Sequence, residues 1–279
     1  MSENPLQPAF ERTVAEGEYR LHRTWPGLFA TGAVGGLDVG MGVFALLLVK
    51  QATGSDMAAA LAFSIGFISL TLANSELFTE NFLVPIATLA AGHCTIRELI
   101  RLWIGTLALN LVGGWVLMAF VIGGFEKLRP VAVEVATHYT HQGIGWTSFA
   151  TAVLGGTVIT LMTWMQQSTE SVPGKLLAAI AAAFLLAAGS LNHAIVVSIE
   201  MFAALHAGAP FGYLDWLGIL GWACLGNMIG GIGLVTVLRL VQVGGDVVQE
   251  TGEQLESEQA QNEKAQNEEA TSSRSRRRK

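Results

Sequence analysis

The chain has 279 residues, of which 51% are hydrophobic and 14% are charged, and its formal net charge at pH 7 is −6. Soluble domains carry roughly a quarter of charged residues, so this composition and several long apolar runs indicate an integral membrane protein. It excludes a basic nucleic-acid-binding protein, and the two cysteines, Cys94 and Cys224, predict neither a disulfide framework nor a metal site.

The first predicted element is a short amphipathic helix over 8–23, within a cytoplasmic N-terminal segment 1–24. Its polar face carries Glu and Arg side chains, and such a helix can lie on a membrane surface. A solvated N-terminal arm is the alternative. The apolar face consists of Phe10, Val14, Gly17 and Leu21.

Six membrane spans follow, in a transport domain over 25–243. A span needs about 20 apolar residues, so the second and fifth are too long for one plain helix. Each also contains a polar break, at 74–81 and 189–193, which predicts discontinuous helices whose free backbone groups are buried against protein or line a cavity. The predicted spans are 25–50, 57–90, 98–124, 147–167, 174–205 and 213–242.

The distribution of Lys and Arg predicts cytoplasmic N- and C-termini. Before the tail is counted, seven of these residues fall on the side of the N-terminus and three on the opposite side. The segment 244–279 is rich in Gln and Glu, and we expect a disordered, charged cytoplasmic tail. Its basic end, "RSRRRK", can contact anionic membrane lipid.

An internal repeat is visible in two glycine-rich motifs, "NLVGG" beginning at Asn110 and "NMIGG" beginning at Asn227. Their offset is 227 − 110 = 117, and the same offset carries Glu76 onto His193, so both polar breaks superpose as well. Three spans followed by three spans predict an inverted repeat, as in many transporters.

His193 is the only histidine in a predicted span. Near its ordinary pKa of about 6.5, an imidazole can attract an anion, or can give a proton to a weak acid that then crosses in neutral form. The alternative is a structural histidine bonded to backbone groups that the break leaves free.

The remaining polar residues of the spans are mainly acidic. We expect Glu76 to accept hydrogen bonds from free N–H groups of the following half-helix, while Ser75 and Thr79 can do the same or offer hydroxyls to a solute. The interiors of the predicted spans contain four carboxylates, that of Glu76 and three others, but only one histidine. This excess of negative charge would repel an anion. The other three, candidate proton or mouth residues, are Asp38, Glu80 and Glu200.

The stretches "NSELFTENFLVP", "GSLNHAIVVSIEMF" and "GNMIGG" resemble the formate/nitrite transporter family over about 25–240. The resemblance implies an all-α membrane protein of six transmembrane helices, two of them broken, arranged as an inverted 3+3 repeat in an aquaporin-like protomer. It also implies a homopentamer with one pore per subunit, which passes small monovalent anions such as formate, nitrite or hydrosulfide, often with a proton.

By this resemblance, His193 corresponds to the central pore histidine, Thr79 faces it, and Asn192 stands where the family usually has Glu. Glu80 stands where the family usually has Gly, and Gly156 where it has a pore-facing Asn. A lysine of the outer mouth is missing, although His138 and His141 lie close by in sequence. The implied constrictions are Leu77 and Phe78 on the cytoplasmic side and Phe63 and Leu186 on the outer side.

These observations predict a pentameric channel or secondary transporter of the inner (plasma) membrane, for a small monovalent anion or its conjugate acid, proton-linked through His193. No cofactor, metal ion or enzymatic activity is expected, because no motif such as "GxSxG" or "HExxH" is present. The alternatives are an aquaporin-like pore for a neutral or cationic solute, and a non-conducting scaffold that recruits a partner through its tail.

Overall fold

The computed structural model describes residues 4–276, with side chains described as far as Ser257 and at 260, 261 and 264. In this part of the chain every regular element is helical. The long helices are α1 (Gln7–Leu21), α2 (Trp25–Thr53), α3 (Asp56–Ala73), α5 (Ile96–Gly124), α6 (Arg129–Gln142), α7 (Trp146–Gln167), α8 (Val172–Ala188), α9 (Ala194–His206), α10 (Tyr213–Met228) and α12 (Gly245–Arg276). The short ones are η1 (Phe78–Phe82), α4 (Val84–Ala90), η2 (Glu126–Leu128), η3 (Ile229–Thr236) and α11 (Val237–Val243).

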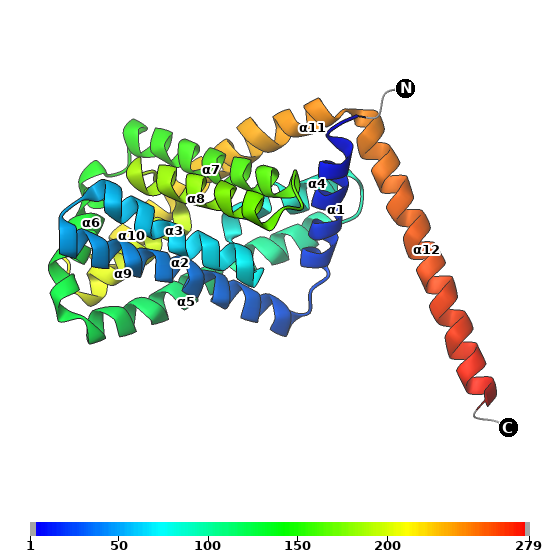
Figure 1. Cartoon of the computed structure of the whole chain (residues 1–279), viewed down its shortest axis with the longest axis horizontal. Coiled ribbons are helices and arrows are strands. Elements are labelled where there is room, and N and C mark those ends of the chain that lie inside the picture. Colours follow the sequence, from blue (N-terminus) through cyan, green and yellow to red (C-terminus); the bar gives the residue numbers. More distant parts are fainter. Residues whose placement is uncertain (1–3, 277–279) are drawn as a thin grey trace.

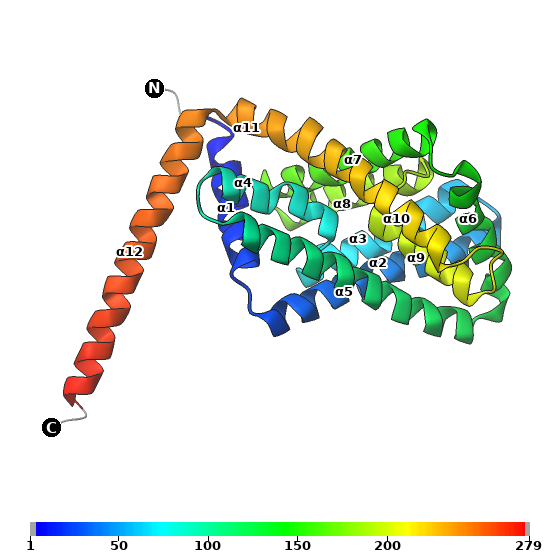
Figure 2. The same ribbon diagram turned by 180° about the vertical axis from the view of Figure 1, so that it is seen from behind.

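The long apolar helices form an elongated bundle (Figures 1 and 2). Helices α1 and α4 lie at one end, from which α12 extends away, and we call this the terminal end; α6 lies at the opposite, distal end (Figure 1). Among the described residues, five helical stretches are long and apolar enough to cross a membrane: α2, α3, α5, α7, and the continuous run from α10 to α11.

The predicted broken spans are confirmed. The second span is divided into α3, η1 and α4, and the fifth into α8 and α9, which have 17 and 13 residues. Each break begins with a residue of positive φ, Asn74 at 52° and Ser190 at 46°. Each ends in an extended residue before the next helix, Leu77 at φ −100° and His193 at φ −97°. The chain therefore turns in the same way in both halves.

These backbone angles correct the register of the repeat by one residue. Asn74 and Ser190 differ by 190 − 74 = 116, as do Leu77 and His193. Leu77, rather than Glu76, is therefore the counterpart of His193. The offset of 117 holds for the two glycine-rich motifs only, because the second half has one more residue between the break and its glycine-rich helix.

The N-terminal helix α1 does not lie free on a membrane surface. Its apolar face, with Phe10 and Val14 fully buried, packs on α4 and closes the terminal end of the bundle. A Cβ at Gly17 would come within 1.9 Å of Thr88 Oγ1, so only glycine allows this close approach.

Two further helices differ from the sequence expectation. Helix α6 lies between the third and fourth spans, where no element was predicted. The segment Gly245–Arg276 of the tail that was expected to be disordered forms helix α12, because Glu, Gln, Ala and Lys are strong helix formers. Its first turns pack Val247, Val248 and Leu255 against the cluster around Phe10.

Glycines set the distance between α2 and α5 and between α7 and α10. A Cβ at Gly36 would lie 2.1 Å from the Asn110 carbonyl oxygen, and one at Gly156 would lie 2.1 Å from the Asn227 carbonyl oxygen. We expect Gly156→Ala to lower the free energy of unfolding by about 1–3 kcal/mol through overpacking. Gly123→Ala, with no atom within 4 Å of the added Cβ, is the control. Thermal unfolding in detergent would test this, and equal midpoints for both variants would contradict it.

Candidate functional site

The two breaks meet through a buried contact between His193 and Thr79. The imidazole Nε2 lies 2.7 Å from Thr79 Oγ1, and neither residue is exposed to solvent. Thr79 belongs to η1 in the first half and His193 precedes α9 in the second, so residues 114 positions apart form one polar pair.

The hydrogen bond at Nδ1 indicates which ring nitrogen of a neutral His193 carries the proton. His193 is the N-cap of α9, and its Nδ1 accepts a hydrogen bond from the Val196 amide at 3.4 Å. A neutral ring that accepts at Nδ1 carries its proton at Nε2. Nε2–H therefore donates to Thr79, and the hydroxyl proton of Thr79 can be donated to another acceptor.

Two asparagines hold the backbone of the breaks in place. Asn227 accepts from the Ala194 amide at 2.9 Å and donates to the carbonyls of Ala152 and Asn192 at 2.7 and 3.0 Å. These bonds satisfy groups that the interrupted helix cannot pair by itself.

Asn110 does the same in the first half. It accepts from the Phe78 amide at 2.9 Å and donates to the carbonyls of Gly32 and Glu76 at 2.8 and 2.9 Å. The sequence repeat contained both asparagines, but its glycines suggested packing and no role was predicted for the amides. Their recurrence opposite two polar breaks was the available signal.

The residues expected to form constrictions are all buried. Leu77, Phe78, Phe63 and Leu186 belong to one hydrophobic core, and none is more than 4% exposed. Phe78 packs edge-on against Phe82, with ring centroids 5.0 Å apart. The polar pair of His193 and Thr79 is therefore embedded among apolar side chains.

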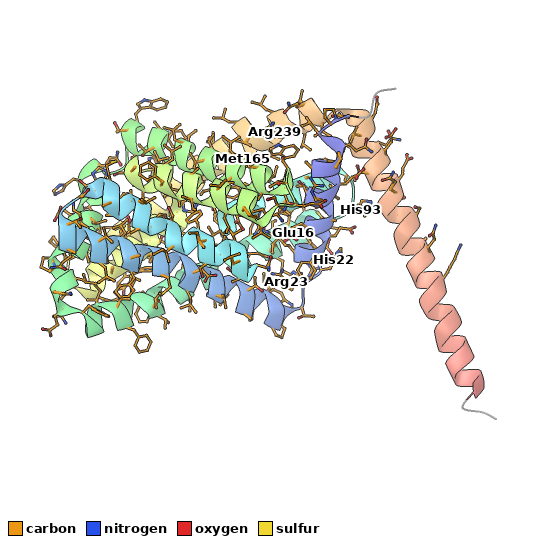
Figure 3. The ribbon with its side chains drawn as sticks, viewed as in Figure 1. Glu16, His22, Arg23, His93, Met165 and Arg239 are labelled. Carbon is orange, nitrogen blue, oxygen red and sulfur yellow. The ribbon has the colours of Figure 1, made fainter. Side chains whose placement is uncertain are left out.

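The carboxylates of the first break are paired with Arg20, in the last turn of α1, and Arg23, just after that helix. Arg23 Nη1 lies 2.5 Å from Glu76 Oε1, and Arg20 lies 3.6 Å from Glu76 and 3.5 Å from Glu80. Figure 3 shows Arg23 at the end of α1 that leads into α2. The expected surplus of negative charge is thus reduced, because the sequence comparison of four acids with one histidine omitted these two cations.

Arg20 is itself buried and also contacts Glu16 at 2.7 Å and Asn81 at 3.2 Å. Burial alone would lower the pKa of this guanidinium, but Glu76, Glu16 and Glu80 outweigh it and raise the pKa above its ordinary value. Arg20 therefore remains charged and neutralises the acids around it.

The expected role of Glu76 at the break is taken by Glu80. The Glu80 carboxylate accepts from the Leu77 amide at 3.3 Å. Glu76 instead forms ion pairs through Oε1, and neither of its carboxylate oxygens accepts a hydrogen bond in the described structure. The reason is geometric: Glu80 lies three residues after the N-cap, where a side chain can reach back to that amide.

Ser75 and Asp38 form a separate buried group. The hydroxyls of Ser69, at 2.5 Å, and Ser75 donate to the two carboxylate oxygens of Asp38. Asp38 thus ties α2 to the end of α3 and to the start of the first break. The sequence did not identify these serine residues as its partners.

Asn192 is buried beside His193. Its Nδ2 lies 3.5 Å from the Ser148 carbonyl, while its Oδ1 has no hydrogen-bond partner within the described residues. An amide oxygen in this position can accept a hydrogen bond from a molecule at the histidine.

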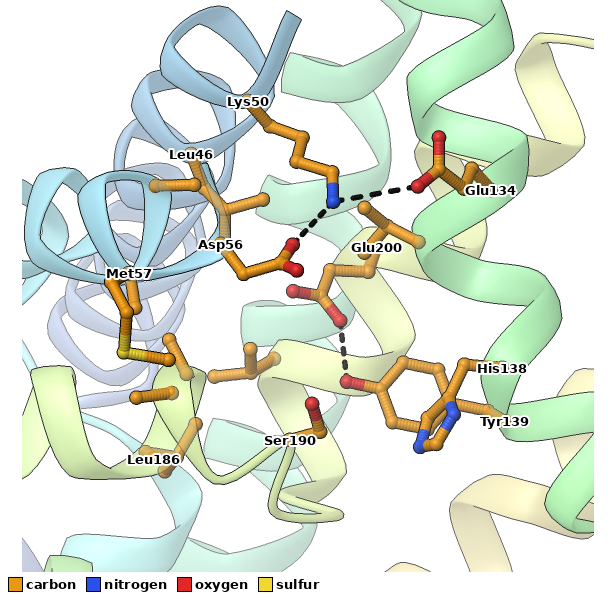
Figure 4. Close-up of a pocket in the computed structure, with 16 residues that line it drawn as sticks. Leu46, Lys50, Asp56, Met57, Glu134, His138, Tyr139, Leu186, Ser190 and Glu200 are labelled. Carbon is orange, nitrogen blue, oxygen red and sulfur yellow. Dashed lines mark hydrogen bonds and ion pairs between the residues drawn. The ribbon is translucent and has the colours of Figure 1, made fainter. Parts of the chain in front are cut away.

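A cavity of about 420 Å³ opens at the distal end (Figure 4). Leu186 and Val196 form part of its wall, so it leads toward the second break. Lys50, His138 and Glu200 also line it. Among the described residues no group of three His, Cys, Asp or Glu side chains is arranged to hold a metal ion.

Comparison with proteins of known structure reveals the same fold. An FNT family ion channel superposes with a TM-score of 0.73 at 18% identity, over 83% of this chain and 97% of that one. A structure described as a pentameric formate channel with formate bound superposes with a TM-score of 0.64 at 20% identity, over 77% and 96% of the two chains. The chain is therefore an all-helical membrane protein of aquaporin-like fold.

The sequence comparisons agree. Inner membrane protein YfdC of Escherichia coli (strain K12) is 25% identical over 253 residues, which are 83% of this chain and 77% of that protein. Formate channel BtFdhC of Bacillus thuringiensis is 22% identical over 239 residues, 81% and 90% of the two chains. The family described as Formate/nitrite transporter matches residues 7–241. The chain therefore belongs to the formate/nitrite transporter family, whose members are channels and transporters rather than enzymes.

Proposed function

We propose that this chain conducts a small monovalent anion such as formate or nitrite, or its conjugate acid, and that a proton is exchanged at His193. The observation that carries the proposal is the hydrogen bond from His193 to Thr79 between the two breaks. This bond places a titratable ring and a hydroxyl at the meeting point of the halves, where Asn192 offers a free amide oxygen.

The apolar surroundings favour a neutral species. An ionised group at the centre of a bilayer costs about 2.5–3.5 kcal/mol or more, whereas a protonated weak acid avoids this cost. An anion that reaches the polar pair between Leu77 and Phe78 on one side and Phe63 and Leu186 on the other would receive a proton from the imidazole once the neutral ring has taken up a second proton. The ring would then return to its neutral form. The acid would then pass the next constriction without its hydration shell.

We also propose a homopentamer in the inner (plasma) membrane, with the terminal end in the cytoplasm. The assembly is suggested by the relative described as pentameric, and the membrane by the relative described as an inner membrane protein. The orientation is supported by the excess of Lys and Arg at the terminal end.

The rival of a pore for a cationic solute loses part of its support. It was based on unpaired carboxylates, and Glu76 and Glu80 are paired with Arg20 and Arg23. Stopped-flow swelling of liposomes with neutral solutes would distinguish an anion channel from the remaining alternative, a pore for neutral solutes. Truncation after Val243 would test the scaffold hypothesis, because a pore would still conduct without α12.

His193→Ala is expected to abolish most formate flux and its dependence on pH, since the variant has no group that exchanges a proton at the break. His206→Ala, at the other end of α9, is the matched control and should keep both. The measurement is formate and nitrite uptake into proteoliposomes between about pH 5 and about pH 8, the range around the ordinary histidine pKa. Unchanged flux and pH dependence in His193→Ala would refute the proposed role.

A further inference from the structure

The distal cavity contains one acid that no basic side chain neutralises. Lys50 is engaged by Asp56 and, at 3.4 Å, by Glu134. Glu200, only 4% exposed, has no Lys, Arg or His partner within the described structure, and its one hydrogen bond comes from the Tyr139 hydroxyl to Oε2 at 2.6 Å. Figure 4 shows the Glu200 side chain directed into the cavity, apart from the ion pairs of Lys50.

Glu200 lies on the same face of α9 as the central histidine. Seven residues separate it from His193, which is close to two helical turns, or about 10.5 Å along the axis. Val196, one turn beyond His193, lines the cavity together with Glu200. This face of α9 therefore runs from the polar pair at the break to the wall of the distal cavity.

Titratable and charged groups from three other helices surround Glu200. Helix α6, which packs on α9, contributes Tyr139, buried beside the carboxylate. Among the cavity-lining residues, α5 and α10 provide no titratable group. The titratable and charged groups that face the cavity with Glu200 are Lys50 from α2, Asp56 from α3, and Glu134, His138 and Tyr139 from α6.

A lone carboxyl group in this position can exchange protons. Keeping a carboxylate charged without a cation in an apolar protein interior is costly, so the group gains from taking up a proton. The cavity, about 420 Å³ in volume, is large enough for water and for a small weak acid. A substrate in it lies on the distal side of Leu186, before the apolar constriction.

We propose that Glu200 is the proton-exchanging group of the distal vestibule, and that Tyr139 positions it. In its acid form Glu200 transfers the carboxyl proton to a weak-acid anion such as formate. The O–H bond of Glu200 breaks, an O–H bond forms on the substrate carboxylate, and the neutral acid moves past Leu186 toward His193. A hydronium ion that reaches the cavity from the distal solution then gives its proton to Glu200 and leaves a water molecule, so one proton enters from that solution for each acid formed.

This inference rests on the proposed function, and a transport assay with a pH readout tests it. Formate uptake and lumenal acidification would be measured in proteoliposomes, with the external solution varied between about pH 7.5 and about pH 5.5, on either side of the ordinary histidine pKa. Orientation would be determined from protease access to α12. Only molecules with the distal end outward are expected to show the Glu200 effect.

Glu200→Gln should lose most of the acceleration that external acid gives the wild type, while Glu200→Asp should keep part of it. Tyr139→Phe should still respond to acid, with the pH midpoint shifted upward, because the phenol stabilises the charged carboxylate. Glu134→Gln removes the same charge from the same cavity, but its side chain is 64% exposed and pairs with Lys50. It should respond to pH as the wild type does.

The outcomes separate the two hypotheses. If the wild type takes up formate with a pH response that Glu200→Gln retains in full, the role of Glu200 is refuted and the proposed function stands. If the wild type takes up neither formate nor nitrite, the proposed function itself fails. A Glu200→Gln variant that is monodisperse in detergent and lacks only the acid response would support the role of Glu200.

Discussion

Asn227→Ala is expected to lower the free energy of unfolding by several kcal/mol and to abolish transport. The side-chain amide is the partner of the Ala194 N–H group and of the Asn192 carbonyl, both at the break. Each buried polar group left without a partner costs about 1–3 kcal/mol, and Asn227 is fully buried. The backbone that presents His193 would then lose its fixed geometry.

Thermal unfolding in detergent and formate uptake in proteoliposomes would test this prediction together. Asn110→Ala should have a comparable effect, because it removes the equivalent bonds to Phe78 and Glu76 in the other half. Thr157→Val serves as the control, since within the described structure that hydroxyl bonds to a carbonyl of its own helix. A stable, transporting Asn227→Ala protein would show that the breaks hold their shape without the asparagines.

Arg20→Met is the second substitution with a large expected effect, a loss of about 3–5 kcal/mol in the free energy of unfolding. Removing one member of a buried ion pair leaves the other charge uncompensated. Glu76 would keep Arg23 as its partner, but Glu80, which is 3% exposed, would have none among the described residues. The contact between α1 and the first break would therefore be weakened at its charged centre.

A double variant distinguishes lost charge compensation from lost packing. Arg20→Met combined with Glu80→Gln should recover part of the stability, because the second change removes the buried charge. Glu170→Gln is the matched control: it breaks an ion pair between α1 and the bundle, but Glu170 is 84% exposed, and exposed pairs contribute about 0–1 kcal/mol. If Arg20→Met unfolds at the wild-type temperature, the buried pairs do not stabilise the terminal end.

The residues of the site and the asparagines and arginines that support it can be tested separately. The asparagines hold the breaks, the arginines neutralise the first break, and the polar pair of His193 and Thr79 lies between them. Mutations of the supports should change unfolding and flux together. Substitutions at His193 and Glu200 should change the pH dependence of flux with smaller effects on unfolding.

Much of this architecture follows from the sequence alone. Spans and breaks are properties of local composition: apolar runs of about 20 residues must cross a membrane as helices, and the polar segments 74–81 and 189–193 interrupt two of them. The repeat of Asn110 and Asn227 predicted two related halves, and the resemblance of the motifs to a known family predicted the fold. These features depend on residues close together in the chain.

Only the tertiary structure decided which charges are paired and which groups meet. Arg20 and Glu80 are 60 residues apart, and Lys50 and Glu134 are 84 apart, so no local pattern relates them. The extra residue between the second break and its glycine-rich helix became visible only in backbone angles, because the polar composition of the breaks is compatible with either alignment. Burial and charge compensation are set by all the helices packed around a group. This is why composition predicted an excess of acid, whereas in the folded chain arginines neutralise two of the four acids, Glu76 and Glu80.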